Sequence, residues 1–302
     1  MNTRHIEGIV ITHPERVLYP DDGIAKRDVA AYYAAVMDWF LPGVAGRPIS
    51  VLRSPEGIGQ AGFFQKHPFP GLKHVSHIRL KEESGAMDDY LCPRDAKSVI
   101  ELVQFGAIEF HPWSAKAETL DHADYLVFDL DPAPGIPWPE VVAAARLIRK
   151  QLDDAMLESL VRTSGGKGLH VVVPLHPACA WDDARRFTQA FARRLASTHP
   201  HTFIAKASKQ ERSGRIFIDY LRNTRGATSI ASYSLRARTG APVAMPMRWD
   251  ELGKSQSGHD FDIHSARRRL ARLKRDPWQD FGSMRQDLHR ALEVFAPIED
   301  VH

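Results

Sequence analysis

The chain has 302 residues and 43% hydrophobic side chains, enough to bury one large core or two fused lobes, which favours a globular protein over a disordered one. The formal net charge is only +3, so an anionic partner must be met by local basic clusters rather than by a uniformly cationic surface. The two cysteines and 15 histidines show no zinc-ligand spacing, and no leader or membrane-spanning apolar run is seen. We therefore expect a cytoplasmic protein without a zinc site or a membrane partner.

The first part of the chain mixes strands and helices. After a short strand and loop, apolar residues recur at helical spacing from Lys26 to Leu41, and Pro42 and Gly43 are expected to end that helix. The further elements predicted here are strands at Ile49–Arg53, Val75–Leu80 and Met87–Leu91, a helix at Pro93–Gln104 and a strand at Ala107–His111.

In the second part, strands and helices alternate. The alternation predicts an α/β (α+β) fold in which helices cover a mixed sheet whose open side carries acidic residues. KSQSGHD, residues 254 to 260, is expected to be a linker. The predicted elements are a helix at Val141–Leu152, strands at Leu160–Thr163 and Leu169–Pro174, a helix at Asp182–Leu195, strands around Asp219 and at Ile230–Leu235, a basic helix at Ile263–Arg275 and a terminal amphipathic helix.

Two aspartates flank one leucine in FDLDP, residues 128 to 132, directly after an apolar run. Residues two apart in a strand face the same side, so Asp129 and Asp131 should lie about 6.5–7 Å apart, at ~3.3 Å per residue. Two partly buried anions that close need a cation between them or a shared proton. Oxygen-only ligation suits Mg²⁺ or Mn²⁺, and a pair of such ions is the usual arrangement for displacement at phosphorus.

A third carboxylate is expected at Asp219, which interrupts an apolar run in RIFIDYLRN. The alternative is that DLDP only ends a strand and enters a turn, since Asp and Pro are common turn residues.

A glycine-rich stretch, TSGGKGLHVVVP, covers residues 163 to 174. Its glycines allow an anion-binding nest of N–H groups, to which Ser164, Lys167 and His170 add donors and charge, as a triphosphate requires. The alternative is an ordinary glycine hairpin between two strands. Arg222, three residues after Asp219, and Arg236 are expected near the acidic face, or else are solvated surface arginines.

Five motifs in order, HPERVLYP, FFQKH, FDLDP, SGGKGLH and FIDYLRN, resemble the polymerase module of bacterial DNA ligase D, a member of the archaeo-eukaryotic primase superfamily. The resemblance covers residues 9 to 277. It implies one primase-polymerase domain over 1–302, with an N-terminal lobe at 1–115, a catalytic RRM-like lobe at 116–254 and a helical tail at 255–302. It also implies metal-dependent, templated or terminal addition of ribonucleotides, and of deoxynucleotides, to DNA 3′ ends in non-homologous end joining.

The resemblance also assigns roles to single residues. Asp129, Asp131 and Asp219 match the metal-binding triad, with two Mn²⁺ or Mg²⁺ ions. His111 matches a histidine near the metals and the reacting sugar; its alternative is a half-buried strand histidine satisfied by the backbone. The residues matching nucleotide-binding positions are Ser164, Gly166, Lys167, His170, Arg222 and Arg236, together with Phe63 and Phe64, which match an aromatic pair against which the base packs and would otherwise be simple core.

Arg16 and Lys26 match a basic pair that holds the 5′-phosphate of a DNA gap or break, and would otherwise be solvated surface charges. The family commonly has asparagine where this chain has His13, lysine where it has Arg16, and a basic residue where it has Leu52. A neutral imidazole at position 13 changes the geometry of that phosphate pocket.

The partners implied are a nucleoside triphosphate, bacterial Ku and a ligase or phosphoesterase activity, with the protein acting as a nucleoid-associated monomer. No adenylating lysine motif follows residue 277, so we expect an excised module or a free-standing polymerase. The residues alone also allow two other functions. The protein could be a metal-dependent phosphoesterase or nuclease that uses the same triad, or a non-catalytic binder of 5′-phosphorylated DNA ends.

Overall fold

The computed structural model describes residues 5–82, 85–208 and 210–295. The chain divides into two compact units, each discontinuous in sequence. The first comprises Met1–Glu118, Thr228–Met245 and His259–Asp276, and the second comprises Thr119–Ala227, Pro246–Gly258 and Pro277–His302. Among the described residues, no helix combines the length and apolar character that crossing a bilayer requires.

The first unit combines a helical layer with small antiparallel sheets. Strand β5 lies between β6 and β9, and the other strands form the pairs β1–β2, β3–β4 and β7–β8. Its elements are β1 (His5–Ile6), β2 (Ile9–Val10), β3 (Val17–Tyr19), η1 (Pro20–Asp22), β4 (Ile24–Ala25), α1 (Lys26–Ala35), α2 (Met37–Val44), β5 (Ile49–Arg53), β6 (Phe63–Gln65), β7 (His77–Lys81), β8 (Met87–Leu91), α3 (Ala96–Gln104), β9 (Ala107–Pro112) and α6 (Ile263–Leu270).

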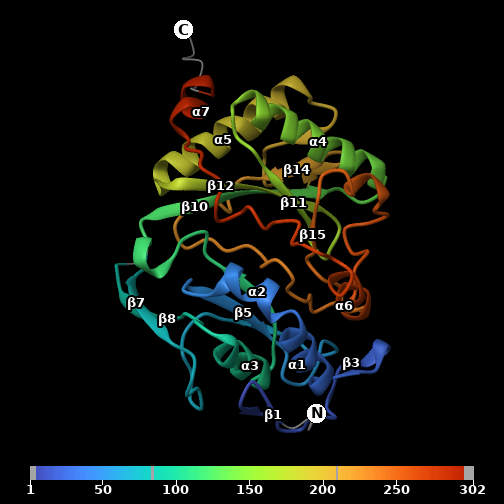
Figure 1. Ribbon diagram of the computed structural model, residues 1–302. Coiled ribbons are helices and arrows are strands. Elements are labelled where there is room, and N and C mark those ends of the chain that lie inside the picture. Colours follow the sequence, from blue (N-terminus) through green and yellow to red (C-terminus); the bar gives the residue numbers. More distant parts are fainter. Residues whose placement is uncertain (1–4, 83–84, 209, 296–302) are drawn as a thin grey trace. The chain divides into compact units, whose positions relative to one another are not determined.

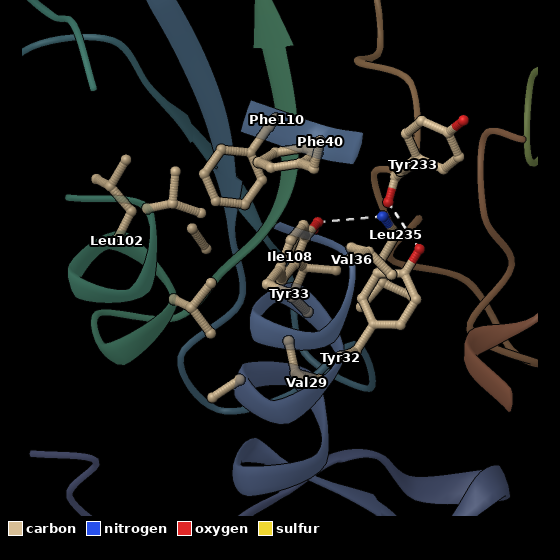
Figure 2. Close-up of a cluster of buried hydrophobic side chains, with 14 of the residues drawn as sticks. Val29, Tyr32, Tyr33, Val36, Phe40, Leu102, Ile108, Phe110, Tyr233 and Leu235 are labelled. Atoms are coloured by element: carbon tan, nitrogen blue, oxygen red, sulfur yellow. Dashed lines mark hydrogen bonds between the residues drawn. The ribbon is translucent and has the colours of Figure 1, made fainter. Parts of the chain in front are cut away.

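The core of the first unit joins segments that are far apart in sequence. Tyr32 and Tyr33 of α1 are fully buried, so their hydroxyls need partners inside the unit. Tyr32 donates to the carbonyl of Tyr233 at 2.8 Å, and Tyr33 donates to the carbonyl of Ile108 at 2.5 Å while accepting from the N–H of Leu235 at 3.1 Å. Figure 2 shows these tyrosines and Phe110 of β9 packed in one cluster.

These contacts explain why the lobes expected from the sequence differ from the observed units. Residues 228–245 were expected in the second lobe and 259–276 in a tail, yet apolar side chains of both segments belong to the first unit's core. Leu235 and Val243 come from one segment, and Ile263 and Leu270 come from α6. Burying the apolar face of α6 against α1 is what a helix of this pattern requires.

Two local predictions for this unit were wrong. The predicted helix from Lys26 to Leu41 is two helices, broken at Val36, and the second continues past Pro42 to Val44. Proline lacks an N–H donor and crowds the carbonyl four residues earlier, yet this helix continues, and the N–H of Ala45 still donates to the carbonyl of Leu41. The predicted strand Ile230–Leu235 is irregular, because Tyr233 has φ of 65°, which is incompatible with an extended strand.

The second unit is a six-stranded sheet in the order β13-β14-β10-β12-β11-β15, with all pairs antiparallel except β13–β14. Helices α4 and α5 lie along the sheet in Figure 1. The elements are η2 (Ala117–Thr119, at the boundary between the units), β10 (His122–Pro132), α4 (Trp138–Asp154), β11 (Leu160–Thr163), β12 (Leu169–Ala180), α5 (Trp181–Thr198), β13 (Phe203–Ile204), η3 (Gln210–Arg212), β14 (Ile216–Asp219), β15 (Pro246–Met247), η4 (Leu252–Lys254) and α7 (His289–Val294).

Alternation along β10 decides which face of this sheet is open. Phe128 contacts Phe187 and Phe191 of α5 through ring centroids 6.4 and 4.8 Å apart. Neighbouring residues in a strand point to opposite faces, so Asp129 lies on the face away from the helices. The structure thus has the mixed α/β architecture, with a central mixed sheet and flanking helices, that the sequence predicted.

Candidate active site

The three predicted aspartates lie on one face of the second unit's sheet. In the β10–β14 pair Asp129 is directly opposite Asp219, and in the β10–β12 pair it is directly opposite His170. Directly opposed residues share a face, with Cβ atoms about 4.5–5.5 Å apart. Asp131 follows two residues along β10 on the same face. The structure therefore brings all three carboxylates together.

Two arginines already lie against these carboxylates. Arg222 Nε is 3.1 Å from Asp219 Oδ2 and 3.9 Å from Asp129 Oδ2. Arg212 Nη1 donates to Asp131 Oδ2 at 2.7 Å. Arg222 was predicted near the acidic face and lies there, whereas Arg212 was missed, because residues 204–214 carry no pattern that places one basic residue at the sheet.

The compensation of charge is incomplete at Asp219. Its pKa is raised by burial and by the charge of Asp129, although Arg222 acts in the opposite direction. A carboxyl group with a raised pKa is stabilised as an anion by an added cation. The triad therefore has the donor set and the charge of a site for a hard divalent ion.

His170 is oriented by a buried arginine. Arg162 of β11 lies opposite it in the sheet and donates to its Nδ1, with Nε 3.2 Å away. Because arginine offers only donors, Nδ1 must be the acceptor and the imidazole proton is on Nε2. Nε2 lies 3.4 Å from Asp129 Oδ1. Arg162 was missed, although a charged residue in the otherwise apolar strand LVRT is a signal of a buried partner.

The glycine-rich loop is a hairpin between β11 and β12, as the alternative reading proposed. The N–H groups of Gly166 and Gly168 both donate to Ser164 Oγ at 3.2 Å. These two N–H groups thus have a partner inside the loop, and the anion-binding role of the loop stays a prediction. Lys167 is exposed and extends the site's positive charge.

Backbone packing explains two glycines at this hairpin. A Cβ at Gly168 would lie 1.8 Å from the carbonyl oxygen of Leu130, the residue between Asp129 and Asp131. A Cβ at Gly258 would lie 2.7 Å from the carbonyl oxygen of Gly168. Three backbone segments therefore stack without space for a side chain, and this stack fixes β10 where it carries the aspartates.

A cleft of about 640 Å³ opens beside Asp131. Lys167 and Arg212 lie on its wall, and segments 131–134 and 212–214 complete it. A cleft of this size lined by one carboxylate and two cations suits a ligand that carries both metal-binding and cation-binding oxygens.

The first unit holds a second group of predicted residues, organised by Glu109, which was missed. Its buried carboxylate is 2.8 Å from His111 Nε2 and 3.1 Å from Arg236 Nε, and it accepts from the N–H of Ala237 at 2.8 Å. Burial raises its pKa, but the hydrogen bond with His111 and the charge of Arg236 outweigh burial and lower the pKa to about 2. The Glu109 carboxylate is thus one partner of the His111 imidazole. The spacing of Glu109 and His111, two apart in one strand, was the available signal.

Phe63 and Phe64 of β6 are 45% and 63% exposed, so the simple-core reading of this pair is wrong. The Phe64 ring lies 5.3 Å from the His111 ring, and the Arg53 guanidinium lies 5.1 Å from the Phe63 ring centroid. Exposed aromatic rings beside charged groups are suited to stacking against a nucleobase.

The basic pair at the start of the chain is also brought together. The N–H of Lys26 donates to the carbonyl of Arg16, and the N–H of Arg16 donates to the carbonyl of His13. Lys26 is buried, so it is not a solvated surface charge; burial and the charge of Arg16 lower its pKa to about 8. The Arg16 side chain also pairs with Glu56 at 2.6 Å.

A further group in the described part of the first unit, His67, Glu82 and Asp88, could hold a metal ion by the proximity of its ligand atoms. Its Glu82 already accepts from Lys66 at 2.7 Å and from Tyr90 at 2.6 Å. These bonds lower the pKa of Glu82. The group is therefore already compensated, unlike Asp219.

Comparisons with known proteins identify the family of the chain. The family model "LigD, primase-polymerase domain" matches residues 25–278. The chain belongs to the LigD primase-polymerase family. The matched span contains the triad, both arginines beside it and Lys26, and it begins after His13 and Arg16.

Relatives and a solved structure show the extent of the likeness. The multifunctional non-homologous end joining protein LigD of Pseudomonas aeruginosa is 39% identical over 290 residues, covering 94% of this chain and 34% of that protein. The LigD protein of Mycolicibacterium smegmatis is 31% identical, covering 97% and 37%. The chain thus spans about a third of the length of these relatives. The polymerase domain of Mycobacterium tuberculosis ligase D, solved with DNA, matches with a TM-score of 0.84 at 30% identity, covering 91% of this chain and 98% of that one.

Proposed function

We propose that the protein is a metal-dependent nucleotidyltransferase that adds ribonucleotides, and deoxynucleotides, to DNA 3′ ends during bacterial non-homologous end joining. The observation that carries the proposal is the meeting of Asp129, Asp131 and Asp219 on one open sheet face, in a chain of the LigD primase-polymerase family. The relative solved with DNA supports DNA as the substrate.

The triad would hold the ions, and Mn²⁺ or Mg²⁺ fits its oxygen-only donor set. When bound, the ions supply neutralisation of phosphate charge and a lowered pKa for the attacking hydroxyl. His170, held through Nδ1 by Arg162, keeps its Nε2 proton toward Asp129 and so orients that carboxylate. Lys167, Arg212 and Arg222 lie where they can balance the charge of a triphosphate and its leaving pyrophosphate.

The proposal includes the residues of the first unit. Phe63 and Phe64 would stack the incoming base, since their rings are exposed. Arg236 would contact the triphosphate and His111 the reacting sugar, both oriented by Glu109. Arg16 and Lys26, with His13, would bind the 5′-phosphate of a gap or break through their clustered charge.

The wider setting is proposed in the same way. The protein would act at the bacterial nucleoid, as a monomer that works with Ku and with a ligase or phosphoesterase activity. The named relatives are end-joining proteins, which supports this setting.

Primer extension on gapped, 5′-phosphorylated DNA tests the proposal, with ribo- and deoxynucleotides and with Mn²⁺ and Mg²⁺. Replacing Asp129 or Asp131 by alanine should abolish extension and leave DNA binding largely intact. Asp182→Ala, at an exposed position at the start of α5, is the control and should extend normally. Retained extension by Asp131→Ala would refute the assignment. Primer shortening without triphosphates would favour a nuclease, and 5′-phosphate-dependent binding without any product would favour an end binder.

A further inference from the structure

Strand β14 ends at Asp219, although the neighbouring strand β10 runs on beside it. Asp219 lies opposite Asp129, and the same antiparallel register, if it continued, would bring Leu221 opposite Val127. The chain instead leaves the sheet in a turn after Asp219. Val127 is fully buried, so its N–H and C=O, which the end of β14 leaves without a strand partner on that side, need another partner inside the unit.

The side chain of Asn223 supplies that partner. Its Oδ1 accepts from the N–H of Val127 at 2.8 Å, and its Nδ2 donates to the carbonyl of Val127, also at 2.8 Å. Nδ2 also donates to the carbonyl of Tyr220 at 3.0 Å, and the N–H of Asn223 donates to the same carbonyl at 3.2 Å. Asn223 is fully buried. An amide has one acceptor and two donors, so this single side chain replaces the strand partner of Val127 and closes the turn at 220–223.

The same turn determines where Arg222 lies. Asp219 Oδ1 accepts from the N–H of Leu221 at 3.0 Å, and Asp219 Oδ2 is 3.1 Å from Arg222 Nε. The Arg222 side chain is 44% exposed, so packing around it does not fix its position. The position of its backbone, which is set by Asn223 at the next residue, therefore decides whether the guanidinium reaches the carboxylates.

We infer that Asn223 is a positioning residue for nucleotidyl transfer, which ends β14 at the triad and holds Arg222 against the triad carboxylates. This inference rests on the proposed function, in which Arg222 balances the charge of the triphosphate. Asn223 is buried and neutral, so it acts through the backbone of the turn and not by touching the nucleotide.

The first test measures the Michaelis constant for the nucleotide in primer extension. A hydrogen bond to a charged group changes an equilibrium constant by about 10- to 100-fold. Arg222→Gln should therefore raise this Michaelis constant by about tenfold or more, and Asn223→Ala should raise it similarly without removing a charge. In the double variant the two increases should not multiply, because both act through the same guanidinium. Increases that multiply would overturn the inference.

A second test measures Mn²⁺ binding without nucleotide, by electron paramagnetic resonance, and needs no extension activity. Arg222 lies against two carboxylates of the triad and so competes with a bound ion. Arg222→Gln and Asn223→Ala should both bind Mn²⁺ more tightly than the wild type, by up to about fivefold, the range of a partly exposed charge pair. General damage to the site would weaken binding instead. A rise for Arg222→Gln with a fall for Asn223→Ala would therefore overturn the inference.

The matched control is Thr188→Val, which removes a buried hydrogen bond elsewhere in the same unit. Thr188 Oγ1 donates to the carbonyl of Ala184 within α5 at 2.8 Å. This variant should unfold more easily than the wild type, yet keep the wild-type Michaelis constant for the nucleotide and the wild-type Mn²⁺ affinity.

Asn223→Ser serves as the second variant if Asn223→Ala does not fold. A serine hydroxyl is too short to meet both backbone groups of Val127, so both measured quantities should shift in the same directions as for Asn223→Ala. Asn223→Ser that behaves like Thr188→Val would overturn the inference. A wild type that binds Mn²⁺ but extends no primer would refute the proposed function, and the Mn²⁺ series would still decide the role of Asn223.

Discussion

Glu109 gives the sharpest test of the electrostatics, because one buried carboxylate faces the imidazole of His111, the guanidinium of Arg236 and the N–H of Ala237. Replacing Glu109 by glutamine keeps the size of the side chain and removes its charge. The side chain is only 5% exposed, so solvent does not screen the loss. His111, Arg236 and the N–H of Ala237 would then face a neutral amide.

The size of the loss in unfolding free energy follows from the pKa of Glu109. Glu109 has an ordinary pKa of 4.5 and a pKa of about 2 in the folded protein. At about 1.36 kcal/mol per pKa unit, its ionised form contributes about 3 kcal/mol to the free energy of unfolding at neutral pH. Because the folded pKa is depressed, the contribution is complete above pH 4.5 and is lost as the pH falls toward 2. By linkage, about 1.4 kcal/mol is lost between pH 7 and pH 3.5.

Urea unfolding of wild type and Glu109→Gln at pH 7, 4.5 and 3.5 measures this contribution. The difference in unfolding free energy between the two should be largest at pH 7 and about 1.4 kcal/mol smaller at pH 3.5. Glu118→Gln is the control, since Glu118 is exposed and makes only a 3.7 Å surface pair with Arg94; its difference should stay near zero. A Glu109→Gln difference that is independent of pH would refute the reasoning.

The other predictions concern the glycine hairpin, the phosphate pair and the triad. Gly168→Ala should lower the unfolding free energy by at least about 3 kcal/mol, because its Cβ would overlap the carbonyl of Leu130, whereas Gly282→Ala, with no atom within 4 Å, should change it by less than about 0.5 kcal/mol. The preference for a 5′-phosphate over a 5′-hydroxyl in DNA binding should fall as pH rises through about 8, where Lys26 loses its charge, and Lys26→Arg should lack this fall between pH 7 and 9.5. Mn²⁺ binding followed by electron paramagnetic resonance should weaken on acidification at a higher pH than for an ordinary aspartate, since the pKa of Asp219 is raised, and Asp219→Asn should remove that dependence.

The sequence predicted those parts of the fold that depend on local patterns. Strands such as Ile49–Arg53 and Leu160–Thr163 were predicted with their observed bounds, because their apolar runs are bounded by clear breaks. The strand expected at Ile230–Leu235 was wrong because the left-handed conformation of Tyr233 is stabilised by its partners Tyr32 and Asp276, which are distant in sequence.

In the candidate site, too, residues with a local sequence pattern were predicted, and residues defined by distant partners were missed. Asp129 and Asp131 could be read from their spacing, and Asp219 from its interruption of an apolar run. Glu109, Arg162 and Arg212 were missed because their roles depend on partners in other strands or segments, between 8 and 128 residues away along the chain. A charged residue inside an apolar strand can signal a buried partner, but the sequence does not say which residue that partner is.

The stacked backbones of Leu130, Gly168 and Gly258 have a practical consequence for mutational scanning of this protein. A library that varies either glycine fully and is sorted only for folded protein should return glycine alone, whatever the assay for activity. The two positions can therefore serve as internal controls of such a scan. The frequency of other residues recovered at either position would measure how often the sorting step retains unfolded protein.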